Sequence, residues 1–320
     1  MFCLHEILEY HIKKDVRFME NKADSSLKMY DELYKDFLEN GDEKIREQIS
    51  DCGGKLLDEA EALYSLNYEE RHEKIVVSLT TIPSRLHAVV YPIKCMLVQT
   101  MRPDKIILWL GENVKDSMLS KELLALKQYG LEIRYVEDVG PHTKYYYALQ
   151  EYKDSLVITI DDDVFYRRDL VEELYKTHMT NPGCVCAFWI WKMKFTYNGI
   201  PYPYKKYYLG YGDVDLEPSH KLIALGVGGV LYPKACLDER AFDLDSLKRI
   251  SLKNDDIWLK AMEIINDVKV ARVPGNNFYQ PTVENTQDIA LMIDNNDWGN
   301  DRWIKNVFKE YQLSEYFRGE

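Results

Sequence analysis

The sequence predicts an α/β protein in which a doubly wound, mostly parallel sheet follows a helical N-terminal extension. From Lys74 onward, short segments of β-branched and apolar residues alternate with segments of helical periodicity, which is the pattern of consecutive βαβ units. Before Lys74 the apolar residues recur at helical spacing. We therefore expect two parts, residues 1–72 and residues 73–320, in a chain of 320 residues that can bury a substantial core.

The N-terminal extension is distinctly acidic. Residues 1–70 contain 18 acidic and 9 basic side chains, which leaves 35 acidic and 32 basic side chains for the rest of the chain. The segments "ENGDE" (39–43) and "DCGGK" (51–55) break the helical pattern. We expect a helical cap packed on the main domain; the alternative is a hairpin that binds a partner or a second copy of the chain. The positions at helical spacing are Leu4, Ile7, Leu8 and His11, then Leu27, Tyr30, Leu33, Tyr34, Phe37 and Leu38.

The main domain begins with four predicted strands, each followed by a predicted helix. The strands are expected at residues 74–80, 104–110, 131–136 and 155–160. Ser84 is a candidate N-cap of the first helix, and Gly130 is a candidate terminator of the second. Asp169, with Glu172 three residues later, resembles a capping box for the fourth. Because ligands of such sheets bind beyond the carboxyl ends of the strands, the residues that follow these strands are candidates for a site.

Composition argues against several classes of protein. The formal net charge is −12, and no basic stripe is available to displace counterions, so no nucleic-acid partner is expected. No apolar run approaches the roughly 18 residues of a membrane span, and the N-terminus carries charges every few positions, unlike a signal peptide. The six cysteines lack metal-ligand spacing. We expect a cytoplasmic protein with reduced thiols.

The stretch "SLVITIDDDVFYRRDL" (155–170) leads from a predicted buried strand directly into three aspartates. In an extended backbone, Asp161 and Asp163 point to one side and Asp162 to the other. Two carboxylates about 6 Å apart repel by roughly 3 kcal/mol at an effective dielectric constant of about 20. A divalent cation such as Mg²⁺ or Mn²⁺ reverses that sign. The cluster therefore predicts a metal site; the alternative is a solvated turn or a helix cap, a role for which Asp169 is available.

Four further segments accompany the aspartates in a fixed order. They are "VSLTTIPSRL" (77–86), "GPHTKYYYAL" (140–149), "LGVGGVLYP" (225–233) and "NDDIWL" (254–259). Together with "ITIDDDVFY" (158–166), they resemble the motifs of nucleotide-sugar glycosyltransferases that have the Rossmann-like GT-A fold and a DxD motif, of the kind found in bacterial polysaccharide biosynthesis. The resemblance extends from about Lys74 to Tyr311.

This resemblance implies a nucleotide-sugar site with Mn²⁺ or Mg²⁺ as cofactor. Asp161 and Asp163 would hold the cation, which bridges the donor diphosphate and neutralises charge as the nucleoside diphosphate leaves. Gly228 and Gly229, in the glycine-containing strand, would let the donor sugar approach the backbone closely. The residues implied to bind the nucleotide sugar are Thr80, Thr81, Arg85, Lys144, Asp161, Asp162, Gly228 and Gly229.

The segment "NDDIWL" places a second acidic pair at a predicted helix start. An N-cap at Asn254 and acids in the first turn are what capping and the helix dipole favour, so a purely structural role is open. The resemblance implies that Asp256, with Asp255 beside it, is the base that takes the acceptor's proton in an inverting reaction. Many relatives add a C-terminal histidine to the cation, but none follows His220. The candidates for the third ligand, which stays unassigned, are Asn276, Asn277 and water.

Residues 188–213 are rich in tryptophan and tyrosine, with lysines between them. Flat rings with polar edges suit the faces of sugars, and the resembling enzymes keep their acceptor region at this place in the chain. The alternative is that Trp189 and Trp191 pack on the sheet. His142 and His220 are expected to be ordinary polar residues. The residues expected to bind the acceptor are Trp191, Tyr204 and Tyr208.

We therefore expect a metal-dependent, inverting glycosyltransferase that uses a nucleoside-diphosphate sugar, with a UDP-sugar favoured. Its acceptor would be a glycan or a lipid-linked glycan, and the protein could lie peripherally on the inner face of a membrane. Two alternatives stay open. A phosphatase of the haloacid dehalogenase type also places Asp-x-Asp after a strand, although Phe165 stands where that family has Thr or Val. The other is a carbohydrate-binding scaffold without activity, against which the intact acids of both motifs argue.

Overall fold

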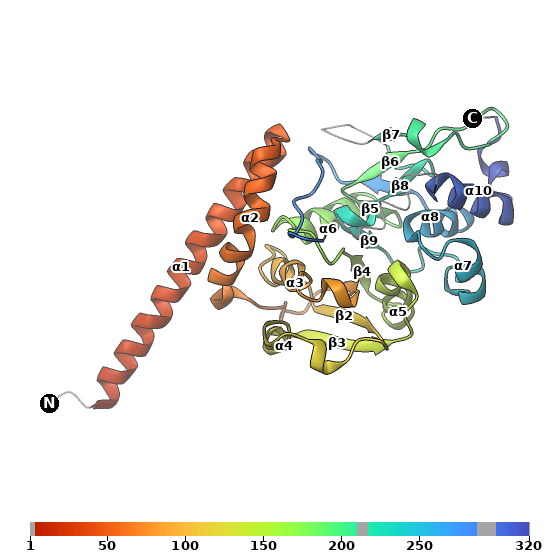
Figure 1. Cartoon of the computed structure of the whole chain (residues 1–320). Helices are drawn as coiled ribbons and strands as arrows, with labels where there is room; N and C mark the ends of the chain where they lie inside the picture. The colour runs from red at the N-terminus through yellow and green to blue at the C-terminus, as the bar shows by residue number, and fades with distance from the viewer. Residues whose placement is uncertain (1–3, 210–216, 287–298, 320) are drawn as a thin grey trace.

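The computed structural model describes residues 4–209, 217–286 and 299–319; for residues 4–17 and 208–209 it describes the backbone alone. The main sheet has seven strands in the order β10-β5-β9-β4-β1-β2-β3, and a second sheet has three in the order β7-β6-β8 (Figure 1). The strands are β1 (Ile75–Thr81), β2 (Lys105–Gly111), β3 (Leu131–Val136), β4 (Leu156–Thr159), β5 (Val185–Ala187), β6 (Ile190–Lys192), β7 (Tyr208–Leu209), β8 (Leu222–Ala224), β9 (Val230–Tyr232) and β10 (Val270–Arg272).

The main sheet is parallel except for β9, which runs antiparallel to both β4 and β5. Both faces of β1 are covered, as expected for a parallel strand. Ile75, Val77 and Leu79 belong to one hydrophobic cluster, whereas Val76 belongs to another, together with Ala148 of α5. The expected α/β fold with a mostly parallel sheet is therefore confirmed.

Helices cover both faces of the sheet, and the two N-terminal helices lie at one side of the domain (Figure 1). The α-helices are α1 (Leu4–Asn40), α2 (Glu43–Glu59), α3 (Val90–Leu97), α4 (Lys121–Ala125), α5 (Thr143–Glu151), α6 (Leu170–Thr180), α7 (Leu244–Ile250), α8 (Asp255–Ile265) and α10 (Asn300–Glu310). Short 3-10 helices span Glu61–Leu63, Pro83–Arg85, Asp116–Met118, Leu126–Tyr129, Gly140–His142, Tyr204–Lys206, Gly226–Gly228, Glu239–Phe242 and Leu313–Phe317. Among the residues described, no helix is both long and apolar enough to cross a membrane.

The strand order creates a crevice between β1 and β4. From β1 the chain adds β2 and then β3 on one side, whereas β4 pairs with the other side of β1. Adjacent loops therefore leave the carboxyl ends of β1 and β4 in opposite directions, and ligands of open α/β sheets bind at such a switch point. The three aspartates follow β4 at this place.

The N-terminal helices pack on the main domain as a helical cap (Figure 1). Leu27, Tyr30, Tyr34 and Phe37 of α1 are buried in the same hydrophobic cluster as residues of β1. Farther toward the N-terminus α1 projects away from the domain, and Phe18 there is 70% exposed. The helical extension is thus confirmed, and its inner half shares the core of the domain.

One of the two expected breaks in the extension is present and the other is not. α1 ends at Asn40, and Asp42 caps α2 by accepting from the amide of Lys44 at 2.8 Å. The break expected at "DCGGK" is wrong, because α2 runs through it. Gly53 and Gly54 serve close packing instead. A Cβ on Gly54 would lie 2.7 Å from the ring of Tyr91, and one on Gly53 would lie 3.1 Å from Phe165.

Two predicted caps are also wrong. Ser84 lies in a 3-10 turn, and α3 begins only at Val90 without a side-chain cap. Asp169 precedes α6 but makes no capping hydrogen bond, because its carboxylate accepts from Arg167 Nη2 at 2.6 Å. Gly130, by contrast, ends the helical segment before β3 as predicted, with a φ of +101°.

Candidate active site

A cavity of about 460 Å³ opens at the carboxyl ends of β1 and β4. Residues from all of the quoted motifs line it, although these motifs lie far apart in the sequence. The lining residues that the sequence singled out are Thr80, Thr81, Arg85, Lys144, Asp161, Asp162, Asp163, Trp191, Tyr204, Asp255 and Asp256.

The three aspartates form a turn rather than a continuation of β4, which ends at Thr159. Beyond the turn, Val164 makes an antiparallel bridge with Thr282. The alternation expected for an extended backbone is therefore wrong. Asp162 and Asp163 share one basic partner, and Asp161 has another. We call residues 161–163 the aspartate turn.

Arg85 is the basic partner of the second and third aspartates. Its Nη1 donates to Asp162 Oδ1 at 2.9 Å, and its Nη2 lies 3.3 Å from Asp163 Oδ2. The hydroxyl of Thr81 donates to the other oxygen of Asp162. Burial raises the pKa of Asp162, although Arg85 opposes that effect. Burial and the neighbouring charge of Asp162 raise the pKa of Asp163 to about 7. Asp162 and Asp163 thus share one guanidinium, and burial and their mutual repulsion favour protonation of Asp163.

Lys144, from α5, connects the two acidic motifs. Its Nζ lies 2.7 Å from Asp161 Oδ1 and 3.1 Å from Asp255 Oδ2, and its side chain is 8% exposed. Burial lowers the pKa of Lys144, but Asp161, Asp255 and Asp256 outweigh it and raise that pKa well above the ordinary value. Lys144 is therefore charged and paired with carboxylates of both acidic motifs, which its expected role in binding the nucleotide sugar did not include.

The second acidic pair begins α8. The side chain of Asn254 caps this helix by accepting from the amide of Ile257 at 2.8 Å, as the sequence indicated. Asp256 Oδ1 accepts from the amide of Gly226 at 3.0 Å. Burial, together with the charge of Asp255, raises the pKa of Asp256 well above its ordinary value. A carboxylate that binds a proton this readily can act as a general base once it is deprotonated.

Aromatic rings form another wall of the cavity. The rings of Trp191 and Tyr204 have centroids 4.1 Å apart, and those of Trp189 and Tyr279 have centroids 5.6 Å apart. All four line the cavity. Tyr208 lies in β7, but its side chain is outside the described residues. The wall could take the face of a sugar ring.

Gly228 and Gly229 do not line this cavity. A Cβ on Gly228 would lie 2.8 Å from the Cβ of Trp189, and Gly229 has a φ of +83°. Both glycines are therefore explained by packing and backbone conformation. Gly226 is the glycine of this segment that lines the cavity, where a Cβ would lie 2.6 Å from Lys144 Nζ.

The two asparagines considered as metal ligands are engaged elsewhere. Asn276 Nδ2 donates to the carbonyl of Leu38 at 2.9 Å, and Asn277 Nδ2 donates to that of Phe188 at 2.7 Å. Neither lines the cavity. They hold the segment that follows β10 in place, and the structure gives no support to either as the third ligand.

Neither histidine considered in the sequence lines the cavity. His142 is buried, with Nδ1 3.0 Å from the hydroxyl of Tyr145 and Nε2 2.9 Å from the carbonyl of Ser251. Burial lowers the pKa of His142 to about 4, so it is neutral at physiological pH. His220 Nε2 lies 3.1 Å from Asp267 Oδ1.

Several cavity residues were missed by sequence reasoning. Asp138 follows β3 as Asp161 follows β4, so the rule that placed the aspartate turn could have found it. Its Oδ1 accepts from the amide of Gly140 at 2.8 Å. Tyr279 and Thr282 come from a segment with no recognisable motif. The other missed lining residues include Lys253 and Asn300.

The charge and donor set of the cavity fit a divalent cation. Six aspartates and three basic side chains line it. Among the described residues, no three or more His, Cys, Asp or Glu side chains are grouped as a metal-binding cluster. Nucleotide sites, however, bind Mg²⁺ through one or two carboxylates, with phosphate and water as the remaining ligands. The carboxylates of the aspartate turn can supply that number.

In sequence, the chain matches no protein-family model and no curated protein. Among solved structures it is similar to glucosyl-3-phosphoglycerate synthase from Mycobacterium tuberculosis, in complex with Mn²⁺, UDP and glucosyl-3-phosphoglycerate. The TM-score is 0.29 and the identity 14%, over 39% of this chain and half (50%) of that chain. It is also similar to CMP:2-keto-3-deoxy-manno-octonic acid synthetase complexed with CTP, with a TM-score of 0.35 and 13% identity over 64% of this chain and 94% of that one. At such low TM-scores these likenesses establish neither a family nor an activity.

Proposed function

We propose that this protein is a metal-dependent glycosyltransferase of the GT-A type that uses a nucleoside-diphosphate sugar, with a UDP-sugar favoured as donor. One observation carries the proposal. Two acidic motifs, at residues 161–163 and 255–256, meet in one cavity together with basic residues and an aromatic wall. If the aspartates only formed a solvated turn and the second acidic pair only capped a helix, neither motif would need to lie near the other.

The donor would bind at the aspartate turn. A diphosphate is anionic, and the cavity already has more acidic than basic side chains, so the anion needs a cation between itself and the turn. Asp161 and Asp163 would hold Mn²⁺ or Mg²⁺, which would supply Lewis-acid neutralisation of the leaving diphosphate. Arg85 and Thr81 hold Asp162 in place, and Thr80, at the end of β1, would contact the nucleotide.

The acceptor would bind on the other side of the cavity. Trp191 and Tyr204 would stack on a ring of a glycan or lipid-linked glycan. Asp256, fixed by the amide of Gly226, would accept the proton of the attacking hydroxyl. The C–O bond to the donor sugar forms as the bond to the diphosphate breaks, with inversion at the anomeric carbon. Lys144 keeps the two acidic motifs together by pairing with both.

The proposal is tested by incubating the protein with a panel of nucleotide sugars and glycan acceptors, with Mn²⁺ or with a chelator. We expect one donor to be consumed, with release of its nucleoside diphosphate, only when the cation is present. Asp163→Asn should abolish the reaction, whereas Asp154→Asn, at an exposed aspartate before the other end of β4, should not. Turnover that is equal with the chelator would contradict the proposal.

A further inference from the structure

We infer that helix α1 is part of the support of this site and that the hydroxyl groups of Tyr30 and Tyr34 position the aspartate turn. The inference rests on the proposed function for its catalytic meaning, but the contacts themselves do not. Tyr30 and Tyr34 are buried, and their rings lie 5.5 Å apart on one face of α1. Both hydroxyls reach the segment directly after the turn, at two residues that do not line the cavity.

The two hydroxyls bind consecutive carbonyl groups of that segment. Tyr30 donates to the carbonyl of Tyr166 at 2.9 Å, and Tyr34 donates to the carbonyl of Phe165. Residues 165 and 166 are in neither a helix nor a strand, so no secondary structure fixes these carbonyls. Side chains from α1, more than a hundred residues earlier in the chain, do so instead.

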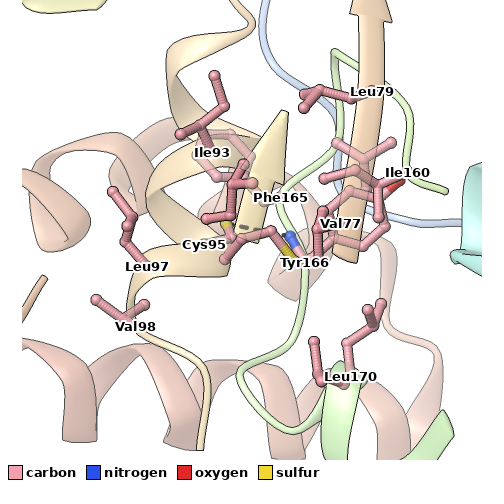
Figure 2. Packing of buried hydrophobic residues seen from close by; sticks show 14 of the residues in the cluster. Val77, Leu79, Ile93, Cys95, Leu97, Val98, Ile160, Phe165, Tyr166 and Leu170 are labelled. Carbon is pink, nitrogen blue, oxygen red and sulfur yellow. Dashed lines mark hydrogen bonds between the residues drawn. The ribbon is translucent and has the colours of Figure 1, made fainter. Parts of the chain in front are cut away.

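Tyr166 connects these hydrogen bonds from α1 to two residues that line the cavity. Its hydroxyl accepts from the amide of Asp161 at 2.8 Å and donates to the carbonyl of Val227 at 3.2 Å. Asp161 and Val227 both line the cavity. The backbone amide of Tyr166 donates to the sulfur of Cys95 at 3.3 Å, and Figure 2 shows both residues within the buried hydrophobic cluster. Tyr166 is thus fixed at its backbone by α1 and α3, while its side chain fixes the turn.

α1 also contacts the segment 278–286, which pairs with the turn. Val283 donates its amide to the carbonyl of Asp163 at 2.8 Å, and Thr286, three residues on, accepts from Arg85 at 2.9 Å. Gln280 of the same segment lies 3.4 Å from the hydroxyl of Tyr34. Phe278 packs on Phe37 of α1, with ring centroids 5.8 Å apart. α1 therefore contacts both the segment that follows the aspartate turn and the segment that pairs with it.

The hydroxyls, rather than the rings, carry this positioning role. A phenylalanine at either place keeps the apolar volume and leaves a carbonyl of the turn segment without its donor. The freed carbonyl can then rotate, and the turn shifts with it. Displacements of about 1 Å at a site can reduce a rate by about a hundredfold. Tyr30 and Tyr34 are positioning residues in this sense, since they touch no reacting atom.

Tyr64 provides a matched control. Its buried hydroxyl also donates to a backbone carbonyl, that of Leu57, at 2.7 Å. That bond lies within the N-terminal extension and does not contact the aspartate turn. Tyr30→Phe, Tyr34→Phe and Tyr64→Phe each delete one hydrogen bond to a backbone carbonyl. Tyr30→Phe also removes the 3.6 Å contact with Cys95 Sγ, and Tyr34→Phe the 3.4 Å contact with Gln280 Oε1, so their losses of stability should be of the same order as that of Tyr64→Phe or somewhat larger. Only the first two should alter the turn.

The test uses the full chain and two measurements. The first is hydrogen exchange of the peptide covering residues 160–166, with no ligand added. We expect exchange there to be about tenfold faster in Tyr30→Phe and Tyr34→Phe, and unchanged in Tyr64→Phe. The second is binding of UDP in the presence of Mn²⁺, which should weaken by about tenfold in the same two variants alone.

Equal exchange of that peptide in all three variants would overturn the inference, as would equal UDP affinity in all three. Should the wild-type protein fail to bind UDP with Mn²⁺, the proposed function fails, and hydrogen exchange still decides whether α1 positions the turn. Should Tyr34→Phe not fold, Tyr30→Phe decides by the same two measurements.

Discussion

The two acidic pairs of the cavity are held in different ways. Asp162 and Asp163 lie in a turn and are held by side chains, chiefly the guanidinium of Arg85. Asp255 and Asp256 begin α8, where Asp256 accepts a backbone hydrogen bond from Gly226. Both carboxylates of the first pair share one basic side chain, whereas the second pair combines a backbone hydrogen bond at Asp256 with an ion pair between Asp255 and Lys144.

This difference suggests different chemistry for the two pairs. Arg85 divides its charge between two carboxylates, so a divalent cation at Asp163 would supply charge that this carboxylate lacks while Arg85 stays paired with Asp162. A carboxylate fixed by an amide and a helix start keeps its place while its proton comes and goes. The turn would therefore serve the leaving diphosphate, and the helix start would serve the attacking hydroxyl.

The largest expected effect follows from removing a charge of the turn. Asp163→Asn keeps the shape of the side chain and removes one cation ligand, so sugar transfer should fall by about a thousandfold or more. Assays at saturating Mn²⁺ would measure it, with Asp154→Asn as the control of equal charge change. Full activity in Asp163→Asn would show that the turn does not bind the cation.

A smaller effect is expected at the helix start. Asp256→Asn removes the proposed base and should lower kcat by about a hundredfold, while UDP binding with Mn²⁺ stays unchanged. Steady-state kinetics and calorimetry separate the two quantities. If the variant loses UDP binding as strongly as Asp163→Asn does, the two pairs do not have separate roles.

Lys144 connects the pairs, so its removal should affect both. Lys144→Met leaves Asp161 and Asp255 without their shared cation, and activity should fall by about tenfold. The pKa of the base should also rise, which moves the acidic limb of the pH–rate profile to higher pH. Lys153→Met, at an exposed lysine, is the control. An unshifted profile would mean that Lys144 does not act on the base.

The smallest effect concerns stability without divalent cations. The pKa of Asp163 is raised from 3.8 to about 7, so over this range the folded protein holds a proton that the unfolded chain releases. This group's contribution to stability is therefore lost as the pH rises toward 7 and changes little above it. Between pH 6 and pH 8, wild type should lose about 1 kcal/mol more than Asp163→Asn in urea unfolding. Equal losses of unfolding free energy in the two proteins would show that Asp163 is not the group that holds this proton.

Local patterns predicted much of the fold. The edges of β3, the αL glycine at Gly130 and the cap at Asn254 each depend on a few neighbouring residues, and sequence reasoning found them. The run of apolar residues before Asp161 also predicted that the three aspartates follow a buried strand, at the end where ligands of such sheets bind. These features needed no knowledge of distant partners.

Features that depend on distant partners could not be predicted. Arg85 pairs with Asp162 across 77 positions of the chain, and Tyr34 reaches Phe165 across 131. The sequence predicted that the aspartates would alternate in direction, but Asp162 and Asp163 both pair with the distant Arg85. The glycines of α2 read as a helix break because their packing against Phe165 and Tyr91 cannot be seen in the sequence.

Calorimetric titration of UDP, with and without Mn²⁺, tests most directly whether the aspartate turn binds a diphosphate through a cation. We predict that wild-type protein binds UDP only when Mn²⁺ is present and that Asp163→Asn does not bind it under either condition. Binding of equal affinity in the presence of a chelator, or undiminished binding by Asp163→Asn, would contradict the account.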